Sequence, residues 1–173
     1  YYQHLFDIPV QQDPTSAWSM LNVGVSDDNS IVPLPSLVNR GTGRNVGVEL
    51  TLEKFISKDY YLLTNATLFS STYTTGSSSK RWHTAMDGGY ILNLTGGGEY
   101  AISKSWTLTA DLKSTFAGGM RYTPLLREQS AAEKRPILDA EQSNTLQMKP
   151  YFRTDIKLGF RHPGRRITEE FGL

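Results

Sequence analysis

The sequence predicts an all-β protein whose antiparallel strands run up and down, as in a segment of a transmembrane β-barrel. Three observations lead to this fold class: a composition rich in strand and turn residues, hydrophobicity that alternates with a period of two, and connections that alternate between short and long. The 173 residues include 16 serines, 17 threonines, 15 glycines, 9 tyrosines, 7 phenylalanines and 3 tryptophans. These residue types favour strands and turns over helices.

Charge balance and the lack of cysteine exclude several classes of protein, whereas mean hydropathy leaves two classes open. Lysine and arginine (18) nearly balance aspartate and glutamate (17), which argues against a nucleic-acid-binding arm. The absence of cysteine excludes a disulfide scaffold, a thiolate metal site and a cysteine nucleophile. A mean hydropathy of -0.39 is compatible with a soluble β-protein and also with an outer-membrane barrel, because only every second residue of a barrel strand faces lipid.

Alternation of apolar and polar residues predicts the strands. It is clearest in residues 46–54, 106–116 and 152–160, where the even positions are mostly apolar and the odd positions polar or charged. Such a period predicts strands with one apolar and one charged face. Weaker patterns predict further strands at residues 1–8, 60–73, 82–101 and 167–173. The last is shorter than the roughly 9–11 residues that a membrane-spanning strand needs.

Connections between the predicted strands alternate in length. The tight turns are residues 56–59, 102–105 and 162–165, and the longer segments are residues 9–39, 74–80 and 123–149. Outer-membrane barrels have short periplasmic turns and longer outside loops, whereas soluble sandwiches more often have short loops at both ends. We therefore predict that turns 56–59 and 102–105 share one rim and that the long segments project from the other.

Aromatic residues gather at the ends of the predicted strands. Beside the short turns lie Phe55, Tyr60, Tyr61, Tyr100 and Trp106, and beside the long segments lie Tyr73, Trp82, Tyr122 and Tyr151. Two such bands are typical of rings that settle at the headgroup level of a membrane. Ordinary strand propensity and core packing are the alternative explanation.

Five segments carry a resemblance to a known family. They are residues 37–50 (LVNRGTGRNVGVEL), 51–61 (TLEKFISKDYY), 88–93 (GGYILN), 117–124 (AGGMRYTP) and 151–160 (YFRTDIKLGF). Their order and spacing resemble barrel strands of TonB-dependent outer-membrane receptors of Bacteroidetes-type bacteria, over effectively the whole chain. The resemblance implies that residues 1–173 are a C-terminal part of a 22-stranded barrel, with about seven spanning strands and without the plug domain or the final strand.

The resemblance also implies a function. It suggests a receptor in the bacterial outer membrane that takes up a scarce nutrient, namely a siderophore, cobalamin, a glycan or a peptide. The implied partners are outer-membrane lipid, the protein's own plug domain, the TonB complex that supplies energy by pulling on the plug, and a surface lipoprotein. No covalent chemistry and no cofactor are expected.

Alternation assigns side chains to two faces of the predicted sheet. The face expected to meet lipid carries Val46, Val48, Leu50, Leu52, Leu108, Leu112, Ile156 and Leu158. The face expected to meet the lumen carries Glu49, Glu53, Asp111, Lys113, Arg153, Asp155 and Lys157. The solvated face of a soluble sheet is the alternative for the charged set. Ligand contacts are expected from the aromatic rings of Trp18, Trp82 and Tyr122, although girdle packing is an equal alternative for the last two.

Catalytic and metal sites are not predicted. The three histidines (His4, His83 and His162) have no spacing that would build a metal site, and Asp87 lies four residues after His83 without a nucleophile elbow nearby. Two other functions stay open on the sequence alone. One is a secreted soluble β-domain that binds a ligand, and the other is an outer-membrane barrel hydrolase such as a protease or lipase.

Overall fold

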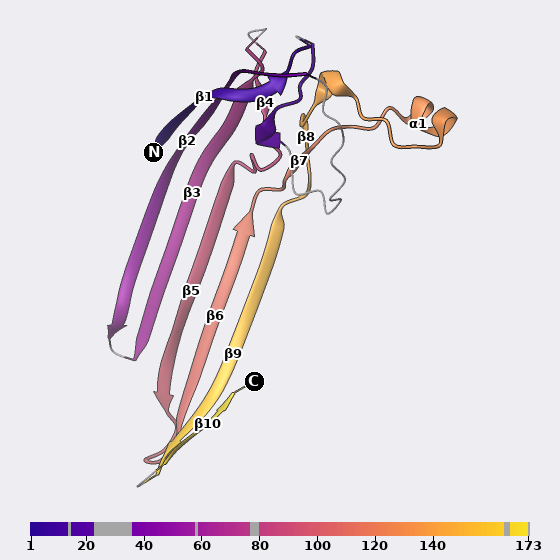
Figure 1. Ribbon diagram of the computed structural model, residues 1–173. Helices are drawn as coiled ribbons and strands as arrows, with labels where there is room; N and C mark the ends of the chain where they lie inside the picture. The colour runs from indigo at the N-terminus through magenta and orange to yellow at the C-terminus, as the bar shows by residue number, and fades with distance from the viewer. Residues whose placement is uncertain (14, 23–35, 58, 77–79, 165–166, 173) are drawn as a thin grey trace. The chain divides into compact units, whose positions relative to one another are not determined.

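The computed structural model describes residues 1–13, 15–22, 36–57, 59–76, 80–164 and 167–172. The strands (Figure 1) are β1 (Tyr2–Gln11), β2 (Leu37–Ser57), β3 (Tyr60–Thr74), β4 (Trp82–His83), β5 (Tyr90–Ala101), β6 (Thr107–Ala117), β7 (Arg121–Tyr122), β8 (Leu146–Gln147), β9 (Tyr151–Pro163) and β10 (Thr168–Gly172). The helices are α1 (Arg127–Glu133) and the 3-10 turns η1 (Met20–Asn22) and η2 (Ala140–Gln142). The predicted all-β class is confirmed.

The main sheet has eight strands in the order β1-β2-β3-β5-β6-β9-β10, with β4 paired to β3, and β7 and β8 form a second, small sheet. Pairing is antiparallel for β1 with β2, β5 with β6, β6 with β9 and β9 with β10, as predicted. Among the described strands, no pairing joins β1 to β10, so the order does not close into a ring. None of the described helices has both the length and the apolarity needed to cross a membrane.

Two predicted boundaries differ from the structure. The strand predicted at residues 82–101 is divided into β4 and β5, because the chain turns between them and Gly89 adopts a φ of +85°. The connection predicted at residues 9–39 is shorter at both ends, since Pro9 pairs with Asn39 after a bulge in β1. Residues 14 and 23–35 of that connection lie outside the described part of the chain.

The chain divides into two compact units. Unit 1 comprises Tyr1–Val48, Leu68–Gly89 and Gly118–Lys149, and unit 2 comprises Glu49–Thr67, Tyr90–Ala117 and Pro150–Leu173. Strands β2 and β3 therefore contribute residues to both units.

Unit 1 contains a small apolar core. The buried side chains of this core are Ile8, Val10, Ala17, Tyr73 and Trp82. The Tyr73 hydroxyl donates a hydrogen bond to the Ala17 carbonyl over 2.6 Å, so its polar end is satisfied within the core. Within the described residues, every buried apolar side chain belongs to unit 1, and unit 2 has none.

The segment at residues 123–149 is more ordered than the predicted loop. It contains α1, η2 and β8, and Leu125 forms a bridge with Leu138. The Ser130 hydroxyl accepts a hydrogen bond from the Ile137 amide over 2.9 Å, which folds the segment back on itself. Helix α1 ends where Lys134 adopts a left-handed φ of 51°.

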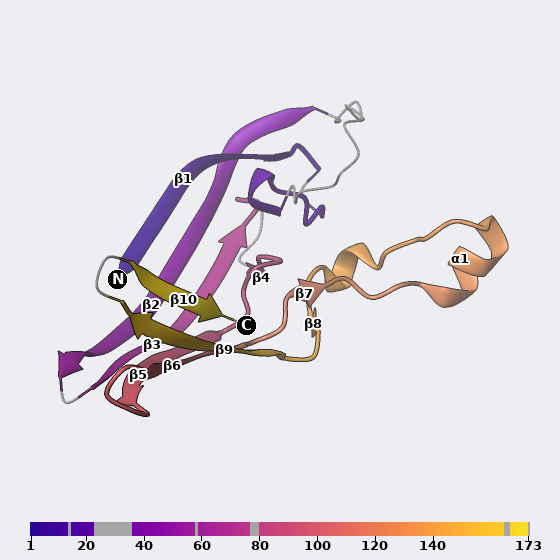
Figure 2. The ribbon, with the colours of Figure 1, turned by 90° about the horizontal axis from the view of Figure 1, so that it is seen from below.

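Unit 2 contains β5, β6, β9 and β10 together with the parts of β2 and β3 that lie between Glu49 and Thr67 (Figures 1 and 2). Its short turns meet at one end, because the Glu99 amide donates to the Asp59 carbonyl over 2.8 Å and the Trp106 and His162 rings lie 4.8 Å apart. The turns at 56–59 and 102–105 therefore share one end, as predicted, although Lys58 lies outside the described residues. At the other end of β6 and β9, Ala117 pairs with Tyr151.

Candidate functional site

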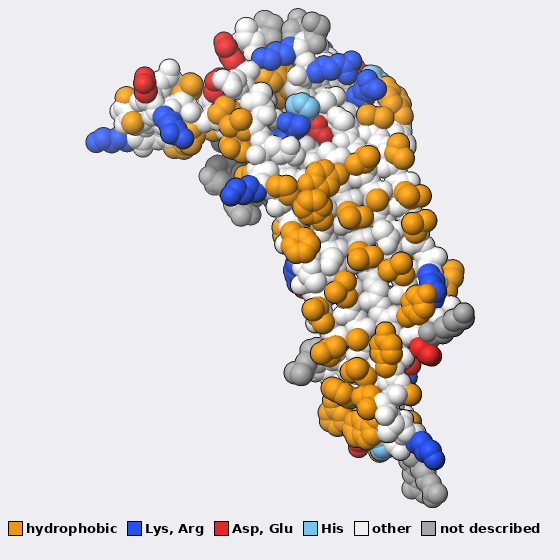
Figure 3. Space-filling model, turned by 180° about the vertical axis from the view of Figure 1, so that it is seen from behind, with side chains coloured by type: hydrophobic (Ala, Val, Ile, Leu, Met, Phe, Trp, Pro, Cys, Tyr) orange, Lys and Arg blue, Asp and Glu red, His pale blue; other side chains and the backbone are white. Residues whose placement is uncertain are grey.

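One face of unit 2 is apolar and uncovered. The register places Leu112 of β6 between Gly96 of β5 and Ile156 of β9, and Phe116 between Leu92 and Phe152. The apolar face comprises the exposed side chains of Leu50, Leu52, Leu62, Leu92, Leu112, Phe116, Phe152, Ile156, Leu158 and Phe160. Ile156 is 67% exposed. Figure 3 shows apolar side chains spread over the strands of unit 2 without a covering layer.

Lys54 marks the end of this face near the short turns. By alternation Lys54 follows Leu50 and Leu52 on the same side of β2. Its Nζ lies 3.5 Å from the centroid of the Tyr60 ring and donates to the carbonyls of Ser57 and Tyr60. The aliphatic stem thus stays beside apolar neighbours while the charge reaches polar groups at the strand end.

The predicted aromatic bands are only partly present. Tyr60, Tyr100 and Trp106 are exposed near the short turns of unit 2. Tyr73 and Trp82 differ from the prediction, because both are buried in the core of unit 1. They pack there because residues of the distant segment 16–22 cover them, a contact that alternation along a single strand cannot indicate.

The opposite face of unit 2 is polar. It carries all seven charged residues of the predicted lumen set: Glu49, Glu53, Asp111, Lys113, Arg153, Asp155 and Lys157. Opposite charges face each other across β6 and β9, since Asp111 pairs with Lys157 and Lys113 with Asp155. Such cross-strand pairs stabilise a sheet, whereas like charges in these positions would weaken it.

Tyr61 ties three strands together on this polar face. Its hydroxyl, from β3, donates to Asp111 Oδ1 of β6 over 2.9 Å. Gly97 of β5 lies between them, and a Cβ there would come within 2.1 Å of Asp111 Oδ1 and 2.9 Å of Tyr61 Cε1. The missing side chain at Gly97 is therefore what allows the tyrosine ring to cross β5, and Tyr61 belongs to the polar face rather than to an aromatic band.

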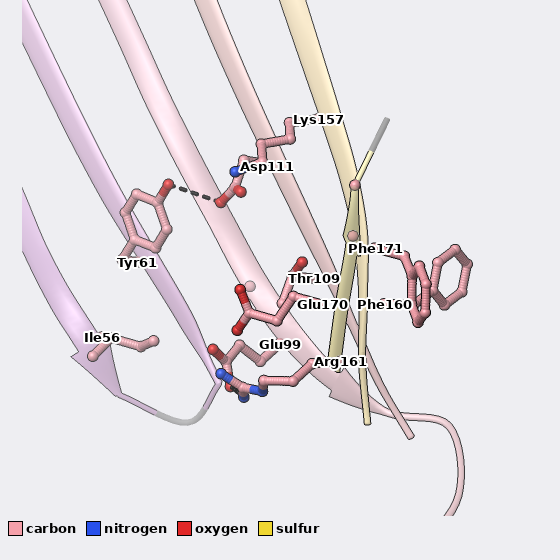
Figure 4. A pocket seen from close by; sticks show the side chains of 13 residues that line it. Ile56, Tyr61, Glu99, Thr109, Asp111, Lys157, Phe160, Arg161, Glu170 and Phe171 are labelled. Carbon is pink, nitrogen blue, oxygen red and sulfur yellow. Dashed lines mark hydrogen bonds and ion pairs between the residues drawn. The ribbon is translucent and has the colours of Figure 1, made fainter. Parts of the chain in front are cut away.

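A recess of about 460 Å³ lies on the polar face near the short turns (Figure 4). Its charged lining residues are Glu99, Asp111, Lys157, Arg161 and Glu170. Arg161 forms an ion pair with Glu99, and Glu170 lies opposite Arg161 in the β9–β10 register. Because this lining mixes three carboxylates with two cations, it suits water or a polar protein segment better than a ligand that carries charges of a single sign. Among the described residues, no group of three histidine or acidic side chains is placed to hold a metal ion.

Replacing Tyr61 with phenylalanine is expected to lower the free energy of unfolding by about 1 kcal/mol, because it removes one partly exposed hydrogen bond to a carboxylate. Chemical unfolding of the full-length protein would measure this change. Tyr100→Phe is the matched control, since Tyr100 is 55% exposed on the same unit. Equal losses in the two variants would contradict a structural role for the bond between Tyr61 and Asp111.

The three aromatic residues predicted to contact ligand lie in unit 1 and have different surroundings. Trp82 is only 5% exposed, and Lys80 Nζ lies 3.8 Å from its ring centroid, so it offers little surface to a ligand. Tyr122 is 41% exposed on β7, opposite Leu146. Trp18 is half-buried and lines a recess.

The sequence did not predict a polar cluster that forms in unit 1 around the buried Asp87. Asp87 is 3% exposed; its Oδ2 lies 2.6 Å from His83 Nδ1 and 3.9 Å from Arg121 Nε. Gln147 Nε2 donates to the carbonyls of Gly88 and Gly119, each over 3.0 Å. In the sequence, only the four-residue spacing of His83 and Asp87 indicated this cluster. The third member, Arg121, lies 34 residues after Asp87 and could not be recognised as a partner.

Catalysis by this cluster finds no support in its geometry. In the described part of the chain, the ring of His83 bonds to Asp87, and no serine or threonine hydroxyl bonds to the ring. A nucleophile within hydrogen-bond reach of the base is what a triad needs. The described contacts of Asp87 instead hold together segments of unit 1.

These observations define a class of protein: an all-β chain with an antiparallel sheet that, in unit 2, has one exposed apolar face and one charged face. Comparisons with models of protein families, with curated proteins and with solved structures found no match.

Proposed function

We propose that the chain is part of the β-barrel of a TonB-dependent receptor in the bacterial outer membrane, which takes up a scarce nutrient. The observation that carries the proposal is the uncovered apolar face of unit 2, opposite a face that holds seven charged residues. A barrel wall in a membrane needs this combination, with lipid on one side and a polar lumen on the other.

Water is a poor environment for the apolar face. Soluble monomers rarely expose contiguous apolar patches larger than a few hundred Å². The face extends over five strands, from Leu50 of β2 to Phe160 of β9, and a residue such as Ile156 is two-thirds exposed. Lipid removes the cost of hydrating these side chains without requiring a second layer of protein.

Strand edges argue for additional strands beyond those described. Unpaired backbone groups at the edge of a sheet are costly in lipid, where no water can satisfy them. Strand β10 has only five residues and β1 lies at the other end of the strand order. Under the proposal, further strands of the full-length protein pair with these edges and close the barrel.

Motifs connect this barrel to TonB-dependent uptake. The segments at residues 37–50 and 117–124 resemble barrel strands of that receptor class, and they lie on β2 and around β7 in the structure. The proposed partners are lipid on the apolar face, a plug domain on the polar face, the TonB complex, and a surface lipoprotein.

Site-specific cross-linking tests this proposal. A photoreactive amino acid placed at Ile156 of the full-length protein is expected to form adducts with phospholipid or lipopolysaccharide in intact cells. The same group at the neighbouring Asp155, which points to the other face, is expected to form none. In the same cells, the full-length protein should also cross-link to TonB.

Two results would contradict the proposal. If no lipid adducts form at Ile156, or if they are equally frequent at Ile156 and Asp155, the apolar face does not meet the membrane. If lipid adducts form at Ile156 and not at Asp155, but TonB is not captured, the protein is a membrane barrel and the TonB-dependent function is contradicted.

A further inference from the structure

Unit 1 contains a second recess, of about 410 Å³, which is chemically unlike the one on the polar face of unit 2. It lies where the end of β1, residues 16–22 and residues 123–144 come together. None of the described residues that line it is charged. Among these described residues, the polar side chains carry hydroxyl and carboxamide groups, and Trp18 supplies the one aromatic ring.

Asn22, one of the residues that line this neutral recess, is held by hydrogen bonds. Asn22 Nδ2 donates to the Tyr73 hydroxyl over 2.9 Å, and Asn22 Oδ1 accepts from the Ala85 amide over 3.0 Å. The Tyr73 hydroxyl in turn donates to the Ala17 carbonyl. Both ends of the Asn22 side chain are therefore fixed, and a ligand would meet a lining that is already ordered.

Hydrogen-bonding capacity remains for a ligand. Asn144, which is 8% exposed, donates through Nδ2 to the His83 carbonyl over 3.0 Å, so its Oδ1 stays available as an acceptor. The Asn144 amide donates to Thr123 Oγ1 over 3.1 Å, so the hydroxyl proton of Thr123 stays available as a donor. Trp18, whose main-chain amide donates to Ser16 Oγ over 3.1 Å, is half-buried and belongs to the lining.

We propose that the neutral recess binds an uncharged, polyhydroxylated ligand, namely a segment of a neutral oligosaccharide. Sugar hydroxyls both donate and accept, which matches the mixed donors and acceptors of Thr123 and Asn144, and the C–H face of a sugar ring packs on a flat indole such as Trp18. The inference rests on the proposed function in one respect, because the bound sugar would be the nutrient that the receptor takes up.

Other ligand chemistries fit this lining less well. Among the described lining residues, an anionic iron chelate would find no lysine or arginine, and a metal cation would find no carboxylate. A peptide would need apolar subsites for its side chains, but the apolar part of this described lining consists of two alanines, Leu138 and Trp18.

Calorimetric titration of the purified full-length protein tests the assignment. The probes are maltohexaose, cellohexaose and xylohexaose, with a blocked neutral hexapeptide and ferric citrate as competing chemistries. At least one hexasaccharide is expected to bind, and Trp18→Ala is expected to weaken its binding at least tenfold, with Trp18→Phe in between. Trp106→Ala is the matched control, because Trp106 is an exposed tryptophan of unit 2, and it should not change binding.

The outcomes separate this inference from the proposed function. Absence of binding by all three hexasaccharides, unchanged binding after Trp18→Ala in a folded variant, or preferential binding of the peptide or of ferric citrate would overturn the sugar assignment. Lipid cross-links at Ile156 do not depend on that result. If a hexasaccharide binds and needs Trp18, but no lipid cross-links form at Ile156, the sugar site in the recess would be supported and the receptor function would be overturned.

Discussion

Under the proposed function, replacing Leu112 with arginine is expected to remove most of the folded protein from the outer membrane. Leu112 lies in the middle of β6, is 37% exposed, and has Gly96 and Ile156 as its cross-strand neighbours on the apolar face. An arginine at the bilayer midplane costs roughly 2–4 kcal/mol in a transmembrane barrel. The measurement is the yield of folded full-length protein in isolated outer membranes.

Two further variants distinguish lipid from packed protein at this position. Lys113→Ala changes the adjacent residue on the polar face and should cost little, because Lys113 is exposed. Leu112→Phe should be tolerated in lipid, whereas a close-packed core resists such an enlargement by about 1–3 kcal/mol. If phenylalanine lowers the yield as much as arginine does, Leu112 packs against protein instead of lipid, and the barrel assignment of β6 is wrong.

Alternation along the sequence predicted the faces of unit 2 well, because the side-chain period of a strand is a local property. Leu112 and Lys113 lie on opposite faces as expected. The pairing of Asp111 with Lys157 could not be derived in the same way, since register depends on β9, in which Lys157 lies 46 residues further along the chain. The glycine at position 97 gave no indication that Tyr61 crosses over it.

Burial in unit 1 was less predictable. An aromatic residue at a strand end has the same local pattern whether it meets a membrane interface or a core. Tyr73 is buried because segment 16–22 covers it, and Trp18 lines the neutral recess because residues 123–144 meet that segment. Helix α1 was missed because it has only seven residues and no side-chain cap at Leu126.

Replacing Asp87 with alanine is expected to lower the free energy of unfolding by about 2–4 kcal/mol, because it removes a buried carboxylate from two cationic or donor partners. His83 Nδ1 lies 2.6 Å from Asp87 Oδ2, and Arg121 Nε lies 3.9 Å from the same oxygen. Chemical unfolding of the full-length protein measures the loss. Glu133→Ala is the control: its pair with Arg135 is at least half exposed on both sides, so about 0–1 kcal/mol is expected.

Asp87→Asn separates the charge of this residue from its hydrogen bonds. Asparagine keeps an acceptor for His83 but loses the negative charge beside Arg121, so its effect should lie between those of wild type and Asp87→Ala. Hydrogen exchange should locate the damage, because the Arg121 amide donates to the Ala85 carbonyl over 2.9 Å next to the cluster. Faster exchange at residues 84–89 and 118–123 in both variants is expected. Exchange that stays unchanged there after Asp87→Ala would show that the backbone bonds alone hold these segments together, and that the buried carboxylate contributes little to unit 1.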